Sequence, residues 1–246
     1  MMKLRPVMFA ALGFSLFLVP ASRADFITSI EPPGVQTSSA ANTTTIDFDS
    51  VSQGYHYTQN FSLPGSLTAS LQGDQFITGA NKFGGAGGTG NFLSLQQGTS
   101  VSLSLSSPQA YFGAWLSALD AYNHVEIYRG DTLVGSFSAN GIENTGLPDS
   151  YFGNPTDPFS GQNMGEHYAF VNFYATTEAD MFDKIVFTND YGGGTGFEMD
   201  NFTFSTTIQP PSVPEPSTLA SSGIALILLS GTWLRKRSRR PTSIPR

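Results

Sequence analysis

Two pairs of acidic residues have a spacing that would let each pair face one ion. Asp47 and Asp49 lie two residues apart near an early apolar run, and Glu198 and Asp200 lie two residues apart near the last one. On a β-strand, residues i and i+2 point to the same face, so each pair can direct its carboxylates at one ion. Calcium takes roughly six to eight oxygen ligands, and carboxylates with nearby carbonyls can supply them. These four residues are therefore the candidate metal ligands, and Ca²⁺ is the candidate cofactor.

The same acidic pairs have two other interpretations. An exposed acidic strand edge resists aggregation, and that role needs no bound ion. Two carboxyl groups that face each other across a cleft of about 5–9 Å could instead serve as the acid and base of a glycoside hydrolase. The choice depends on which carboxyl groups meet in space, and the order of residues does not show this.

A long stretch at 139–166 carries aromatic residues that could bind sugar. Tyr151, Phe152 and Phe159 stand there among Gly, Asn and Pro residues. A connection of this length exceeds what a compact domain needs, which favours a functional or partly disordered loop. The three rings either form an exposed platform for polysaccharide or fold back over the domain as a lid, and the packing role is slightly favoured.

Other short motifs have ordinary explanations. Residues 85–90 match the glycine pattern of nucleotide-binding loops, but a strand-like run follows them where such a loop requires a helix. The Arg-Gly-Asp sequence at 129–131 suits a hairpin turn. His56, His124 and His167 are the only histidines, and none has zinc-ligand spacing. No nucleophile-turn motif is present either, which gives a serine hydrolase little support. We predict that the protein is not an enzyme.

Charge is distributed unevenly along the chain. Residues 25–212 contain 18 Asp and Glu but only three Lys and Arg, a net charge of −15 against −7 for the whole chain. So acidic a domain argues against nucleic acid as a partner and favours solubility and divalent cations. The chain has no cysteine, which excludes disulfides, thiol catalysis and cysteine zinc sites.

The elements that must position these residues are short strands. Residues 99–105 alternate strictly between apolar and serine side chains, which is typical of a half-buried strand. Other short runs with strand signals occur at 44–48, 91–95, 110–116, 125–128, 133–137, 168–174, 184–187 and 201–204. Eight or nine strands with turn residues between them, and no helix, predict a single antiparallel β-sandwich over residues 25–212.

The N-terminus has the pattern of an export signal. Lys3 and Arg5 precede an apolar run at 7–19, and the small residues Ser22 and Ala24 follow it. This order is typical of a secretory signal peptide over residues 1–24, which signal peptidase removes after Ala24.

The C-terminus predicts a membrane segment. Residues 217–234 are mostly apolar and basic residues follow at 235–240. An 18-residue helix is about 27 Å long at 1.5 Å per residue, which is marginal for a single transmembrane helix. The basic stop would hold the C-terminus on the cytoplasmic side. The protein would touch the membrane only through this segment until it is processed.

Residues 213–240 as a whole resemble the PEP-CTERM sorting signal of bacterial surface proteins. Val213, Pro214, Glu215 and Pro216 match its proline motif. The resemblance implies export, transient membrane anchoring and processing by an exosortase. Release to the cell surface or the extracellular matrix would follow.

The domain itself carries family features. Residues 111–120, 167–173, 182–187 and 196–201 resemble a family of PEP-CTERM surface proteins. The ending Gly-Phe-Glu-Met-Asp-Asn at 196–201 is also similar to the ends of carbohydrate-binding jelly-roll domains. That second resemblance implies a jelly-roll-like sandwich with a structural calcium near Glu198 or Asp200.

These observations predict a non-catalytic surface or matrix protein with a structural or adhesive role, in contact with extracellular polysaccharide. Two alternatives remain open. One is a calcium-dependent carbohydrate-binding module, and the other is a glycan-active hydrolase that uses carboxylates of the domain.

Overall fold

The structure, a computed structural model, describes residues 26–139, 147–190 and 196–209. The strands in these residues are β1 (Phe26–Ile30), β2 (Thr44–Ile46), β3 (Gly54–Ser62), β4 (Thr68–Gly79), β5 (Asn91–Leu95), β6 (Thr99–Gln109), β7 (Tyr111–Leu119), β8 (Asn123–Arg129), β9 (Thr132–Ser138), β10 (His167–Ala175), β11 (Phe182–Asn189) and β12 (Phe197–Ser205). Short 3-10 helices lie at η1 (Pro64–Ser66), η2 (Ala86–Gly88), η3 (Asp149–Tyr151) and η4 (Glu178–Asp180). The prediction of an all-β antiparallel domain is confirmed.

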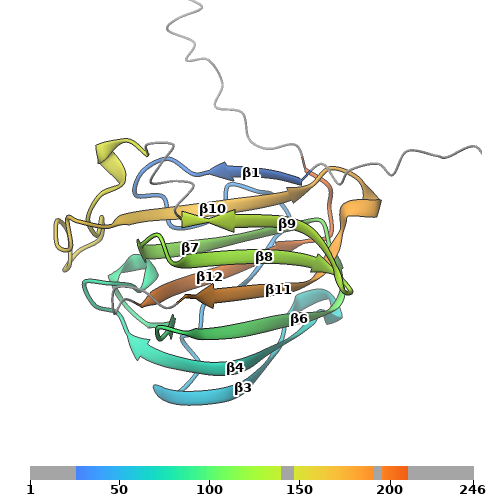
Figure 1. The fold of residues 1–246 in the computed structure, drawn as a ribbon, viewed down its shortest axis with the longest axis horizontal. Helices are drawn as coiled ribbons and strands as arrows, with labels where there is room; N and C mark the ends of the chain where they lie inside the picture. The colour runs from blue at the N-terminus through green and yellow to red at the C-terminus, as the bar shows by residue number, and fades with distance from the viewer. Residues whose placement is uncertain (1–25, 140–146, 191–195, 210–246) are drawn as a thin grey trace, which may run out of the picture.

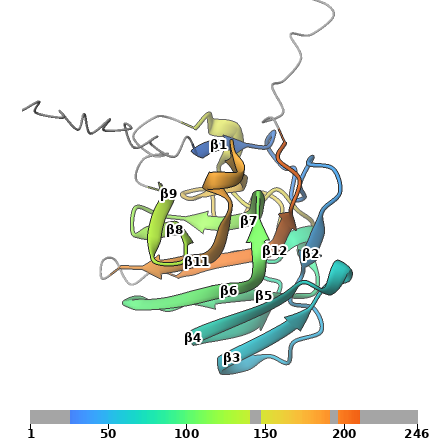
Figure 2. The same cartoon turned by 90° about the vertical axis from the view of Figure 1, so that its right-hand side faces the viewer.

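The strands form one antiparallel sheet that folds into two layers (Figure 1, Figure 2). The front layer contains β9, β8, β11, β6, β4 and β3, and the back layer contains β1, β10, β7 and β12, with β2 and β5 beside β12. The long strand β4 joins the layers, because Ala69–Gln72 pair with β6 and Phe76–Gly79 pair with β5. The sandwich expected from the sequence therefore has connected layers, and its jelly-roll-like connection order stays a prediction.

The bend in β4 requires a glycine. Gly73 lies between the two paired halves of β4 with φ of +123°, a conformation that side chains disfavour. A Cβ atom at this position would lie only 2.5 Å from the backbone oxygen of Ser100 on β6.

The two end strands of the sheet, β1 and β9, come together. The Phe26 ring of β1 lies directly against Gly135 of β9. The sheet is therefore nearly closed on itself.

Aromatic side chains fill the space between the layers. Phe187 on β11 stacks on Phe202 of β12 with ring centroids 4.8 Å apart, and Phe112 on β7 meets Phe187 at 5.9 Å. Phe137 on β9 meets Phe173 on β10 edge-to-face at 5.8 Å. Full burial of each large apolar side chain stabilises the fold by about 1.5–3 kcal/mol. This core holds the layers together without disulfides.

The outer faces of the two layers differ in exposure. Every residue of β7 and β10 in the back layer is buried, so both faces of these strands are covered. Residues of the segments 80–90 and 147–166 provide part of the cover, since the Tyr168 hydroxyl donates a hydrogen bond to the Lys82 carbonyl and Asn154 Nδ2 donates another to it. Strands β6 and β8 in the front layer alternate between buried and accessible residues. The front layer therefore presents one open face.

Three strands were not predicted from the sequence, namely β1, β3 and β4. No helix in the described ranges has the length and apolarity needed to cross a membrane. The predicted signal peptide at 1–24, the sorting motif from Val213 to Pro216 and the membrane segment at 217–234 lie outside the described residues.

Candidate functional site

Glu198 and Asp200 lie on the covered outer face of β12. The side chains of Phe197 and Met199 enter the core between the layers, so the alternating acidic residues point the other way. Glu198 is 9% exposed and Asp200 is 3% exposed. Both carboxyl groups are therefore buried beneath the covering segments.

The carboxyl group of Asp200 is held by backbone donors. The Ala86 amide donates a 2.8 Å hydrogen bond to its Oδ2 and the Asn201 amide a 2.7 Å bond to its Oδ1. Burial raises the pKa of Asp200 to about 7, while these bonds lower it and the negative charges of Asp49 and Asp47 raise it further. Asp200 thus fastens η2 to the sheet and lies within electrostatic reach of the first predicted acidic pair.

That first pair is exposed at the surface. Asp49 Oδ1 accepts a 2.8 Å hydrogen bond from the Asn91 amide, and Asp47 Oδ1 accepts one of 3.2 Å from the Asp49 amide. The Asp49 carboxylate also packs against Gly90, where any Cβ atom would clash with it. Asp47 and Asp49 therefore order the turn that joins β2 to β3 and fasten it to the start of β5.

Glu198 has a different set of neighbours. Ser94 on β5 donates a 3.3 Å hydrogen bond to its Oε1. Burial, with added repulsion from Glu166 and Asp120, raises the pKa of Glu198 to about 8. Burial also raises the pKa of Glu166 above its ordinary value. Asp120 has a buried Oδ2 atom with no hydrogen-bond partner. The sequence did not indicate that Glu166 and Asp120 lie near Glu198, because both are far from it along the chain.

The four predicted metal ligands do not form one group. The negative charges of Asp47 and Asp49 raise the pKa of Asp200. The pKa of Glu198 is raised instead by Glu166 and Asp120. Across the described residues, no three His, Asp or Glu side chains come together in a way that could hold a metal ion. Calcium binding stays a prediction.

The predicted sugar-binding aromatics lie against the domain. Tyr151 is half-buried and its hydroxyl donates a 2.8 Å hydrogen bond to the Glu31 carbonyl. The ring of Phe152 lies 3.9 Å from that of His167, and Phe159 is half-buried. These positions fit the packing role for Tyr151 and Phe152. Sugar binding by the three residues stays a prediction.

The open face of the front layer, called here the exposed face, is made of the outward side chains of β3, β4, β6, β11, β8 and β9. Residues that pair directly across antiparallel strands share a face, so the strand register defines rows of side chains. One row runs through Ser100, Thr188, His124 and Ser138, and another through Asn60, Ser70, Ser104, Lys184 and Tyr128. Hydroxyl and amide groups therefore dominate this face.

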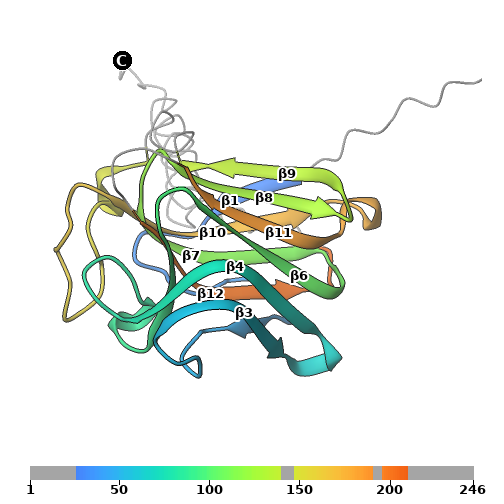
Figure 3. The same cartoon turned by 60° about the horizontal axis from the view of Figure 1, so that its bottom comes forward.

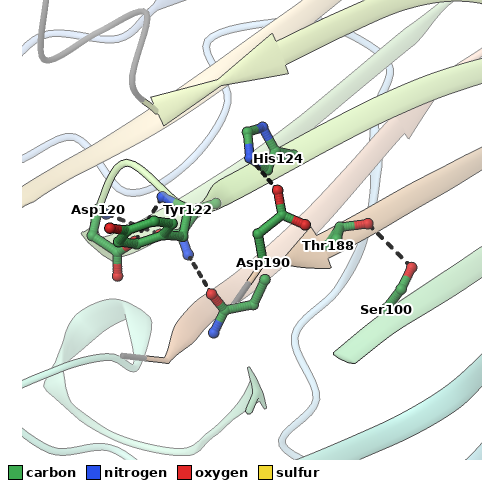
Figure 4. A network of polar contacts seen from close by, with 8 residues as sticks. Ser100, Asp120, Tyr122, His124, Thr188 and Asp190 are labelled. Atoms are coloured by element: carbon green, nitrogen blue, oxygen red, sulfur yellow. Dashed lines mark hydrogen bonds and ion pairs between the residues drawn. The ribbon is translucent and has the colours of Figure 1, made fainter. Parts of the chain in front are cut away.

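A hollow of about 370 Å³ lies at one end of the exposed face, and we call it the His124 hollow. Its lining consists of His124, Glu126, Ser136, Phe137, Ser138, Thr188 and Asp190. His124 Nε2 lies 3.0 Å from Asp190 Oδ2, and Thr188 donates a 3.1 Å hydrogen bond to Ser100 (Figure 4). The Asp190 amide bonds to the Tyr122 carbonyl at 3.0 Å, which fixes the carboxylate beside the histidine.

A second hollow, of about 320 Å³, lies further along the same face. It is lined by Asn60, Phe61, Ser62, Thr68, Ala69, Ser70, Ser104, Leu105 and Ser106. None of these side chains is charged. The exposed face thus contains two open depressions rich in hydroxyl groups.

No local pattern in the sequence indicates the His124 hollow. The spacing of the three histidines only argued against a zinc site, although His124 and Glu126 stand two apart on one strand and share a face. Asp190 and Thr188 reach the same place only because β11 pairs with β8. No spacing along the chain indicates that pairing.

Comparisons with known proteins give only distant similarities. No protein-family model matches the chain, and no curated protein matches it. One similar structure is the K2 cleaved adhesin domain of Lys-gingipain, with 16% identity, a TM-score of 0.33, and coverage of 74% of this chain and 99% of that one. The catalytic domain of a GH87 alpha-1,3-glucanase in complex with tetrasaccharides has 17% identity and a TM-score of 0.35 over 68% of this chain and 31% of that one. The family 11 carbohydrate-binding module of a cellulosomal cellulase of Clostridium thermocellum has 15% identity and a TM-score of 0.32 over 70% of this chain and 99% of that one.

Proposed function

We propose that this chain is an exported, non-catalytic surface or matrix protein whose domain adheres to neutral polysaccharide through the exposed face. The observation that carries this proposal is the His124 hollow, where a histidine, two carboxylates and several hydroxyl groups line an open depression. Sugar hydroxyl groups both donate and accept hydrogen bonds, so a mixed lining of donors and acceptors suits them.

The charge of the domain narrows the ligand class. With 18 acidic and three basic residues between 25 and 212, the domain would repel sulfated or uronic-acid polymers. Glu126 and Asp190 add negative charge at the hollow itself. Neutral polysaccharide meets no such repulsion, and a polymer can contact several rows of the exposed face at once.

Location at the cell surface is supported by the termini. The export pattern at 1–24 and the PEP-CTERM-like segment at 213–240 together favour delivery through the membrane and processing by signal peptidase and an exosortase. A domain retained in the matrix would gain avidity from many weak contacts with a repeating polymer.

Affinity electrophoresis of the protein in gels that contain polysaccharide tests the proposal. We expect retardation by at least one neutral glucan, mannan or galactan, and none by sulfated or uronic-acid polymers. Retardation by anionic polymers alone, or by no polymer in the set, would overturn the proposal.

A second candidate function is glycan hydrolysis with Glu198 as the general acid. The observation that favours it is the pKa of Glu198, raised to about 8, because a general acid must hold its proton at neutral pH. Turnover of a polysaccharide that Glu198→Gln abolishes, with the fold intact, would establish this function in place of the first.

A calcium-dependent carbohydrate-binding module would give a different result. Binding would be lost on chelation, and Asp200→Asn would reproduce that loss.

A further inference from the structure

The strand β3 forms a long open edge of the sheet. It has nine residues, and β4 is its only pairing partner in the part of the chain that the structure describes. Two of its side chains, Tyr55 and Tyr57, are 70% and 67% exposed. An edge strand presents unpaired backbone N–H and C=O groups that can pair with another strand.

The other ends of the sheet are protected. The edge strands β1 and β9 approach each other, with the Phe26 ring against Gly135. Strand β2 is only three residues long. Figure 3 shows β3 at the outer border of the front layer, away from β1 and β9. Within the described residues, β3 is therefore the longest edge open to another strand.

Charge also distinguishes this edge. No Asp, Glu, Lys or Arg occurs between Ser50 and Gly73, although the domain carries 18 acidic residues. Natural edge strands are usually protected by charges, proline or bulges. Strand β3 has no charged residue and no proline, and its bulge lies at one position, between His56 and Thr58. When two copies approach along this strand, they therefore bring no charged side chain of β3 together.

The regular part of the strand is long enough to pair. Residues Thr58–Ser62 pair without interruption with Gln72–Thr68 of β4. Thr58, Asn60 and Ser62 are exposed, and their side chains belong to the exposed face. Phe61 points inward, where its ring meets Phe48 at 5.8 Å. A new strand along Thr58–Ser62 would therefore leave the core unchanged.

We propose that β3 pairs antiparallel with β3 of a second copy of this chain, through Thr58–Ser62. The two copies then share one continuous front layer, and their exposed faces join into a single larger surface. Such pairing is two-fold symmetric and closes on itself, which gives a dimer rather than an open fibre. This inference is independent of the ligand, because it uses the backbone edge and not the His124 hollow.

Single cysteines test the pairing directly, because the chain has none of its own. Side chains directly opposite in antiparallel strands have Cβ atoms about 4.5–5.5 Å apart, close enough for a disulfide after small adjustment. The variants Thr58→Cys, Asn60→Cys and Ser62→Cys are produced in the full chain and oxidised with copper phenanthroline. Ser104→Cys is the matched control, since Ser104 is exposed on the same face but lies on β6.

We expect Asn60→Cys to form disulfide-linked dimers about tenfold more readily than the Ser104→Cys control, because residue 60 lies opposite its own copy and pairing raises the effective thiol concentration. Thr58→Cys and Ser62→Cys should instead link to each other when the two variants are mixed. Adding Thr58→Asp and Ser62→Asp to Asn60→Cys should reduce that yield, since Thr58 of one copy lies opposite Ser62 of the other and like charges then meet across the paired strands. Equal linkage of Asn60→Cys and the control, or linkage that the two aspartates leave unchanged, would overturn the proposal.

The unmodified chain gives a second measurement. Raising the salt concentration from about 0.01 M to 1 M shortens the Debye length from about 30 to 3 Å, which screens repulsion between acidic copies. Sedimentation should therefore show more dimer at high salt. A chain that remains monomeric at every salt and protein concentration would contradict the pairing.

Discussion

The hydroxyl group of Ser94 on β5 donates a hydrogen bond of 3.3 Å to Oε1 of Glu198 on the neighbouring strand β12. The two residues face each other in the strand register, on the covered side of the sheet. Among the described residues, the charged groups that shift the pKa of Glu198 are Glu166 and Asp120, and both are acidic. A buried carboxyl group in this setting is more stable when protonated.

The stability of the fold should therefore decrease as pH rises. Burial raises the pKa of Glu198 from 4.5 to about 8, so the folded protein holds this proton more tightly than the unfolded chain. The stabilisation is fully present below pH 4.5 and is lost as pH rises through 8. At about 1.4 kcal/mol for each pH unit, the effect amounts to several kcal/mol. Urea unfolding at pH 5, 7 and 9 measures it.

Glu198→Gln is the control for this pH dependence. The amide has nearly the shape of the protonated acid and does not ionise, so the variant should keep more of its stability at pH 9. The remaining slope should come from Asp200, whose pKa burial raises to about 7. Equal slopes for the variant and the wild type would show that Glu198 does not control the alkaline loss.

A second prediction concerns the buried network around Asn172. Asn172 accepts a 2.6 Å hydrogen bond from the Tyr111 hydroxyl and donates one of 3.1 Å to Glu31. Asn172→Ala leaves these buried groups with fewer partners and should lower the free energy of unfolding by about 2–4 kcal/mol. Asn60→Ala, at an exposed position, should change it by about 0.5 kcal/mol or less. Chemical denaturation of both variants compares them, and similar losses would contradict the role of the network.

The bend of β4 gives a third prediction. Gly73→Ala combines an unfavourable φ with a Cβ atom 2.5 Å from a backbone oxygen, so it should cost several times more stability than a glycine substitution in open space. Gly65→Ala is the matched comparison, because Gly65 also has positive φ but no atom lies within 4 Å of its added Cβ. The comparison variant should lose about 1–2 kcal/mol. Thermal unfolding that ranks the two variants equally would show that β4 can bend without this glycine.

Processing of the C-terminus is a fourth prediction. Intact-mass analysis of protein released from the cell surface should show loss of everything beyond the proline motif at Val213–Pro216. Replacing Pro214 and Pro216 with alanine should leave the tail uncut, because the extended conformation that proline favours would be lost. Mature wild-type protein that retains residues up to Arg246 would refute the sorting prediction.

The sequence was informative where strands are half-buried or bounded by clear turns. The alternation at 99–105 predicted β6, and the turn at 129–132 predicted the hairpin of β8 and β9. Strand β3 lacked a clear signal because it is an edge strand with few buried side chains. Strand β4 carries Gly73 and the buried polar Gln75, which interrupt its apolar alternation.

The candidate site was harder to predict because it depends on pairing between distant strands. The acidic residues of β12 were singled out by their spacing, and the structure places both under a cover that their spacing does not indicate. The His124 hollow joins residues of β8, β9 and β11, and only the strand order brings them together. Local patterns therefore indicated the strands, while the register determined the site.

We propose that neutral polysaccharide binds to the exposed face and not to the loop that carries Tyr151 and Phe159. The most direct test is the dissociation constant for a retained polymer, measured for Thr188→Ala with Asp190→Ala and, separately, for Tyr151→Ala with Phe159→Ala. We predict that the first pair weakens binding about tenfold or more, which corresponds to about 1.4 kcal/mol, while the loop pair leaves it nearly unchanged. Loss of binding in the loop pair, with full affinity in the exposed-face pair, would show that the loop and not the exposed face binds the polymer.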